Sequence, residues 1–146
     1  MDMQTILETA SKNIGGNIKV KGLMRKEGRL KPGAENPGDV LGFDYIVHYD
    51  NTCFEYYSAN PPLSGTTQAL PITCPLGIEI FEDYPVDYKT AITIFHKGNW
   101  GSQFTSIALA KPLVHPRSSE PYWYLMSNLG QAVVIGADSG EIVCPA

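Results

Sequence analysis

The residue types that most often perform catalysis or hold metals are three cysteines and three histidines: Cys53, Cys74, Cys144, His48, His96 and His115. A thiol enzyme needs a thiolate beside a histidine, and a thiolate is stabilised most easily at the start of a helix. No cysteine stands at such a position. Cys-x-x-Cys spacing, a histidine cluster and the Gly-x-Ser-x-Gly motif are all absent, so we expect neither a metal site nor a hydrolase.

The three cysteines cannot all pair within one chain. We expect buried, reduced thiols. The alternative is one disulfide with one free thiol, which would revise the compartment to an oxidising one.

Two further patterns carry possible chemistry. The carboxylates of Glu79, Glu82, Asp83 and Asp87 cluster around an expected helix start, where negative charge also favours the helix dipole. The segment 98–102 (Gly-Asn-Trp-Gly-Ser) is similar to a phosphate loop, but it follows a helix and offers no helix N-terminus to an anion. The sequence therefore predicts no enzyme and no cofactor.

Tyrosine and tryptophan are the most informative set, because these residues dominate binding hot spots. Successive residues of a strand point to opposite faces, so Tyr122 and Tyr124 share one face and Trp123 takes the other. One set must pack under the helices, and the other is a candidate partner surface. An ordinary aromatic core is the alternative. The candidate surface residues are Tyr45, Tyr49, Tyr56, Tyr122, Trp123, Tyr124 and Trp100.

Composition sets the class of protein. The 146 residues are 43% hydrophobic and 18% charged, which predicts one folded domain over 1–146. The net charge of −4 repels phosphate backbones, so nucleic acid is not expected as a partner. Six basic residues fall between positions 19 and 31, either as a solvated strand edge or as a docking patch for an acidic partner. They are Lys19, Lys21, Arg25, Lys26, Arg29 and Lys31.

The sequence has no apolar run of membrane-spanning length and no basic, apolar start typical of a secretory signal. We therefore expect no membrane association and a cytoplasmic protein. A trimmed mature form that is secreted or periplasmic would have the same sequence. The oligomeric state is left open.

The elements that position these residues follow from periodicity. Apolar residues at helical spacing predict one helix over 3–14, capped by Asp2, and a second that begins at Asp83 and ends at Gly98. Strands are expected over the residue ranges 18–24, 43–49, 53–58, 77–81, 104–111, 121–127, 132–137 and 141–144. Asp50-Asn51 is expected to form a hairpin turn. The prolines of 60–75 exclude a continuous element there.

Both halves run helix, glycine, strand, proline-containing loop, aromatic strand, tight turn, strand. We therefore expect an α+β fold, with two helices on one face of a mostly antiparallel sheet. One interpretation of this pattern is an internal repeat of a helix-plus-three-strand unit, over 1–60 and 84–144 with the proline-rich segment 60–76 between. The alternative is that any α+β chain with hairpins has this order of elements. The other face of the sheet would then be partly open.

The second half carries Glu120-Pro121-Tyr122-Trp123-Tyr124 and, further on, Asp138-Ser139-Gly140-Glu141. Over 85–143 it resembles the PepSY domain and its cystatin-like relatives, which have a Trp-centred strand and a similar terminal turn. A tandem pair also resembles the β-lactamase inhibitor proteins. The first half has no matching tryptophan or turn. The resemblance implies a non-enzymatic module that binds another protein, as an inhibitor or immunity-type protein. The alternative is a small-ligand or enzyme pocket between sheet and helices.

Overall fold

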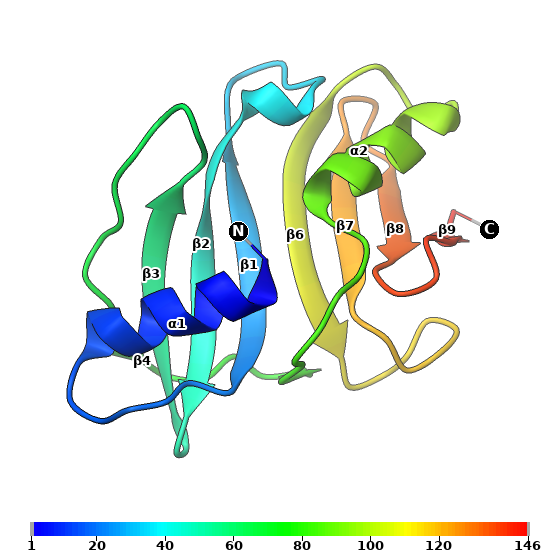
Figure 1. Cartoon of the computed structure of the whole chain (residues 1–146). Coiled ribbons are helices and arrows are strands. Elements are labelled where there is room, and N and C mark those ends of the chain that lie inside the picture. Colours follow the sequence, from blue (N-terminus) through cyan, green and yellow to red (C-terminus); the bar gives the residue numbers. More distant parts are fainter. Residues whose placement is uncertain (1, 146) are drawn as a thin grey trace.

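The computed structural model describes residues 2–145, in which two helices lie on one face of a nine-stranded, antiparallel sheet (Figure 1). This is the predicted α+β fold. The elements are α1 (Met3–Ile14), β1 (Gly22–Leu30), a 3-10 turn η1 (Pro37–Asp39), β2 (Val40–Tyr49), β3 (Thr52–Ala59), β4 (Leu70–Ile72), β5 (Ile78–Glu79), α2 (Tyr88–Lys97), β6 (Phe104–Pro112), β7 (Tyr122–Ser127), β8 (Ala132–Gly136) and β9 (Ile142–Cys144).

The first helix is as predicted. The side chain of Asp2 accepts a hydrogen bond from the backbone N–H of Thr5 at 2.8 Å. Gly15 ends the helix with φ of 88°. Ile6 and Ala10 are buried against the sheet, because the apolar residues fall on one helix face.

The predicted start of the second helix at Asp83 is wrong. The N-cap is Asp87, whose side chain accepts from the backbone N–H of Thr90 at 2.8 Å. The preceding chain is held by the sheet instead, since Val86 donates to the carbonyl of Ala137 and accepts from the indole of Trp123, both at 2.8 Å. These long-range bonds override the local signal. Gly98 ends the helix as predicted.

The strand predicted over 18–24 is also misplaced, because β1 starts at Gly22 and continues to Leu30. It lies in the middle of the sheet, paired with β2 on one side and β6 on the other. Arg25, Lys26 and Arg29 therefore do not lie on an edge strand. Lys19, Lys21 and Lys31 lie outside β1 and are exposed, as the solvated interpretation expects. A register shift between Leu23 and Arg25 turns Lys26 to the helix-covered face, where it is buried.

The two hairpins are confirmed. Asp50 and Asn51 both have positive φ, 48° and 63°, and join β2 to β3. The chain β7-β8-β9 forms the expected terminal meander. The proline-rich segment contains one element that was not predicted: the three-residue β4, which pairs with β3 at the edge of the sheet.

The strand order is β4-β3-β2-β1-β6-β7-β8-β9, with β5 paired to β6. Each helix is followed by three consecutive antiparallel strands. The first strands of the two sets, β1 and β6, meet in the middle through three residue pairs, Arg25 to Ala110, Lys26 to Leu109 and Glu27 to Ala108. This order is the one expected of a repeated unit, and the duplication itself stays a prediction.

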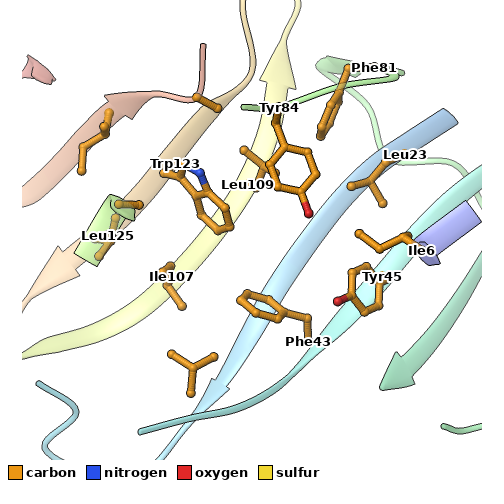
Figure 2. Close-up of a cluster of buried hydrophobic side chains, with 14 of the residues drawn as sticks. Ile6, Leu23, Phe43, Tyr45, Phe81, Tyr84, Ile107, Leu109, Trp123 and Leu125 are labelled. Carbon is orange, nitrogen blue, oxygen red and sulfur yellow. The ribbon is translucent and has the colours of Figure 1, made fainter. Parts of the chain in front are cut away.

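The main hydrophobic core lies between the helices and the sheet and takes residues from both halves, including Ile6, Phe43, Ile107, Trp123 and Leu125 (Figure 2). A second, smaller cluster lies on the opposite face around Met24, Ile46 and Cys53. Below, the helix-covered side of the sheet is called the inner face and the opposite side the outer face. Among residues 2–145, no helix has the length and apolarity needed to cross a membrane.

Candidate functional site

Four of the seven aromatic residues predicted to form a partner surface are fully buried: Tyr45, Tyr56, Tyr122 and Trp123. Three of them lie on the inner face under the helices. Tyr122 lies on the outer face, but its hydroxyl donates to the carbonyl of Ser118 at 2.7 Å, within the loop that covers it. The prediction that these four residues form an exposed surface is therefore wrong, because their rings are packed in the interior.

The polar tips of the inner-face aromatic residues are hydrogen-bonded, as a buried aromatic core requires. The hydroxyl of Tyr56 donates to the carbonyl of Ile6 at 2.9 Å, and its ring stacks on Tyr45 with centroids 5.2 Å apart. The indole of Trp123 donates to the carbonyl of Val86. Through these bonds, Tyr56 on the sheet holds α1, and Trp123 holds the segment that leads into α2.

The remaining three predicted residues, Tyr49, Tyr124 and Trp100, are half-buried. Tyr49 and Trp100 pack against the main core. The ring of Trp100 occupies the space that a Cβ at Gly98 would take. Its indole nitrogen is buried and has no hydrogen-bond partner among the described residues. Tyr124 pairs with Ala108 and Val134, which places it on the outer face.

The outer face carries charged pairs instead of an aromatic patch. Arg29 forms a two-pronged ion pair with Asp44 at 2.8 and 2.9 Å, and its guanidinium lies 4.1 Å from the ring centre of Tyr57. The hydrogen bonds that the Arg29 guanidinium donates to the Asp44 carboxylate raise the pKa of Arg29. Arg25 and Glu27 pair at 3.2 Å. A shallow recess of about 170 Å³ lies among these side chains and Glu55.

Two of the cysteines are paired, which corrects the expectation of reduced thiols. Cys53 on β3 and Cys74 just after β4 form a disulfide with Cα atoms 5.1 Å apart, while Cys144 is free and exposed. The pairing of β3 with β4 brings Cys74 beside Cys53, because Ile72 is the partner of Cys53 in the register. A disulfide-bonded cysteine has no thiolate, so Cys53 and Cys74 are not nucleophiles in this state.

Lys26 is the unexpected residue of the inner face. It is 1% exposed, and its ammonium donates to the hydroxyl of Tyr84 at 3.2 Å. It lies 4.0 Å from the ring centre of Phe43 and 5.2–5.6 Å from those of Tyr45, Tyr84 and Trp123. Figure 2 shows these four rings converging on one space. No carboxylate among the described residues forms an ion pair with Lys26.

A cavity of about 510 Å³ reaches Lys26 between the N-terminal ends of the two helices. Its other lining residues are Asp2, Met3, Asn60, Pro61, Asp83, Tyr84, Pro85, Asp87, Tyr88 and Lys89. The amide of Asn60 donates to the carbonyl of Val40 and is thereby fixed. The lining combines the rings of two tyrosines, two amines and three carboxylates, which is the mixture of apolar and polar groups typical of ligand sites.

Burial lowers the pKa of Lys26 to about 7, and the nearby Asp87 carboxylate opposes that shift. Burial also raises the pKa of the Tyr45 and Tyr84 hydroxyls. At neutral pH the amine is therefore partly uncharged, while both hydroxyls are protonated and can donate. An uncharged amine is a nucleophile and a base, so Lys26 is capable of chemistry beyond binding in this cavity.

A larger groove of about 730 Å³ runs beside α1 and is lined by Leu7, Ser11, Ile18 and Val20, among others. Ser11 accepts from the backbone N–H of Val20 and so ties the helix to the segment that follows it. The groove is open, and its charged side chains Glu8, Lys12 and Lys19 are not buried.

Glu120 is the second buried charge, and it has a structural role. Its carboxylate accepts from the backbone N–H groups of Asp138 and Ser139 at 3.0 Å and from the hydroxyl of Ser118 at 2.7 Å. Burial raises the pKa of Glu120, but the hydrogen bonds outweigh it and the pKa is lowered. The carboxylate thus fixes the turn between β8 and β9.

Sequence reasoning missed Lys26 because the residue belongs to a basic run and precedes an acidic neighbour, Glu27. Plain alternation from the buried Leu23 would place Arg25 and Glu27 on the inner face, and the register shift at Met24 reverses this. The sequence pattern assigns Asp87 only to a group of carboxylates around a helix start, and Tyr84 follows the expected cap Asp83. No local signal connects them to position 26.

No group of three or more metal-ligating side chains occurs within residues 2–145. Comparison with family models, curated proteins and solved structures finds no match to this chain. The resemblance to the PepSY domain and its cystatin-like relatives therefore stays a prediction.

Proposed function

We propose that this chain is a non-enzymatic module that binds another protein, acting through the outer face of its sheet. The observation that carries the proposal is the one-sided fold. Both helices cover the inner face, which leaves the outer face of β1, β2, β3 and β6 without a covering helix (Figure 1). The buried aromatic residues are not part of this surface.

The side chains of the outer face suit protein recognition. Arginine and tyrosine are enriched in binding hot spots, and Arg29 lies over the ring of Tyr57, held in place by Asp44. Adjacent positive and negative groups, with the exposed Glu55, give a charge pattern that a complementary partner can match. An inhibitor or immunity-type protein, as the resemblance implies, is the most specific version of this proposal.

We place this function in an oxidising compartment. The Cys53–Cys74 pair favours a secreted or periplasmic setting over the cytoplasm that was first expected, because cytosolic thiols are kept reduced.

The test is affinity capture from the native host, with identification of bound proteins by mass spectrometry, using three forms of the chain. One is the wild type, and one carries Arg29→Ala with Glu55→Ala on the outer face. The matched control carries Lys12→Ala with Glu8→Ala on the exposed side of α1, which removes the same charges. A partner of the outer face is captured by the wild type and the control and is depleted about tenfold or more by the outer-face variant.

Equal capture by the two double variants, or loss with the α1 variant alone, would overturn the outer face as the binding surface. Recovery of no partner together with bound small-molecule density or turnover would overturn protein binding as the function. The cavity at Lys26 is the observation that favours a second, small-molecule function.

A further inference from the structure

We propose that Lys26 is a site of covalent carbonyl capture, at which its amine forms an imine with a small aldehyde or ketone that is uncharged or cationic. The compound enters the cavity between the N-terminal ends of α1 and α2. This inference is independent of the proposed protein partner, because the cavity lies on the inner face of the sheet.

The position of Lys26 is hard to explain by packing alone. A methionine would fill similar volume in a central strand without any desolvation penalty. The amine instead has a single hydrogen-bond partner among the described residues, the hydroxyl of Tyr84, and no ion pair. A buried amine that borders a cavity of about 510 Å³ is an arrangement typical of functional sites.

The amine is available as a nucleophile at neutral pH. With a pKa of about 7, roughly half of the Lys26 amine is uncharged at pH 7. An exposed lysine with a pKa near 10.4 is uncharged in only about one molecule in 2,500. Lower basicity also reduces nucleophilicity, so we expect a net preference of about tenfold or more for Lys26.

The walls select the class of compound. The rings of Tyr84 and Tyr88 line the cavity and offer apolar contact to a carbon chain. The cavity is lined by three carboxylates, Asp2, Asp83 and Asp87, against one further cation, Lys89. This balance disfavours anionic carbonyl compounds such as keto acids and sugar phosphates.

The chemical step is a condensation without redox change. The uncharged amine of Lys26 adds to the carbonyl carbon, and the carbonyl oxygen takes up a proton to give a carbinolamine. The nitrogen loses its remaining proton and the hydroxyl leaves as water, so a C=N bond replaces the C=O bond. The imine formed in this way is neutral. When its nitrogen takes up a proton from solvent, the resulting cation lies among the same aromatic rings, whose faces attract positive charge. The hydroxyl of Tyr84, which accepts from the amine, is placed to move the proton.

The pH dependence of the step reflects the titratable groups, among the described residues, that line the cavity or lie beside the amine. These are Tyr45 from β2, Tyr84, Asp83 and Asp87 from the segment before α2, Tyr88 and Lys89 from α2, and Asp2 from the start of α1. Asp87→Asn keeps an N-cap side chain but removes the charge that favours the ammonium. In that variant, half-maximal modification is expected at lower pH than in the wild type.

The test treats the folded wild-type chain with propanal and sodium cyanoborohydride at pH 7, and maps the propylated lysines by peptide mass spectrometry. Cyanoborohydride reduces the imine to a stable secondary amine. We expect Lys26 to be modified about tenfold or more faster than the exposed Lys12 and Lys31. With glyoxylate, an anionic aldehyde, that preference should fall several-fold.

A Lys26→Met variant, with its fold checked by circular dichroism, should lose only the fast component of modification. If this variant does not fold, the comparison of lysines within the wild-type chain still decides. Lys26 that stays unmodified until the chain is unfolded, or that reacts no faster than Lys12, would overturn the proposal. Fast modification of Lys26 that is equally fast with glyoxylate would overturn the selection by charge.

Discussion

At the scale of single residues, two buried charges behave in opposite ways. Glu120 receives hydrogen bonds from two backbone N–H groups and two hydroxyls, so its charged form is stabilised and its pKa is lowered. The neighbours of the Lys26 amine are one hydroxyl and four aromatic rings. They replace only part of the hydration that the ammonium loses on burial, so the pKa of Lys26 is lowered. The first is a structural anchor, and the second is a candidate reactive group.

Glu120→Gln should lower the free energy of unfolding by about 1–3 kcal/mol at pH 7, because a charged acceptor of several hydrogen bonds is lost. A lowered folded pKa means that this stability is present above the ordinary value of 4.5 and is lost as pH falls through the folded value. The difference between wild type and variant should therefore shrink at pH 3. Urea denaturation at both pH values measures it.

Glu141→Gln is the control, because Glu141 forms an exposed ion pair with Arg117 that contributes little to stability. A Glu120→Gln difference that is the same at pH 7 and pH 3 would contradict the assigned role.

Lys26→Met should change the pH dependence of stability. The folded pKa of about 7 lies below the unfolded value of 10.5, so the unfolded chain binds more protons between these values. Wild-type stability relative to the variant should rise from pH 7 to 9.5, by at most about 1.4 kcal/mol per pH unit. Chemical denaturation across this range is the measurement, and parallel curves for the two proteins would contradict it.

At the scale of the elements, β1 and β4 decide what the side chains do. The shift at Met24 puts Lys26 on the inner face and leaves Arg25, Glu27 and Arg29 on the outer face. The three residues of β4 bring Cys74 to Cys53. Neither feature is visible in local periodicity.

Replacing Cys53 and Cys74 together by serine should lower the free energy of unfolding by about 3 kcal/mol, because the disulfide closes a loop with a sequence separation of 21. Chemical denaturation measures the loss. Alkylation under denaturing, non-reducing conditions should label Cys144 alone.

Cys144→Ser should leave stability nearly unchanged and abolish that label. Alkylation of all three cysteines without reductant would show that the pair is not formed.

The sequence predicts an element well where neighbours along the chain determine it. Asp50 and Asn51 turn the chain because both tolerate positive φ, and Ala91 and Phe95 mark a helix by spacing alone. It fails where distant partners decide. Asp87 displaces Asp83 as the helix cap because β7 and β8 hold Val86. The sequence predicts the positions of the aromatic strands correctly. The exposure of their side chains depends on which face of the sheet the helices cover, and local sequence does not determine that.

At the scale of the whole molecule, one core joins the two halves, with α1 and α2 both packed on it. We expect a single cooperative unfolding transition. Both tryptophans, Trp100 and Trp123, lie in the second half, whereas far-ultraviolet circular dichroism reports on the entire chain. The two signals should follow the same urea curve.

A Phe54→Trp variant adds a fluorescent probe to the first half, where Phe54 packs against the core. Separate midpoints for the two halves would contradict a shared core.

The edges of the sheet have a consequence for self-association. One edge is β4, a three-residue strand with Pro71 at its centre, and the other is β9, which Pro145 follows. Proline has no N–H to offer a neighbouring strand, and short edges give little length for pairing. A sheet with such ends resists growth by addition of further strands, so this architecture protects the chain from edge-to-edge assembly into fibrils.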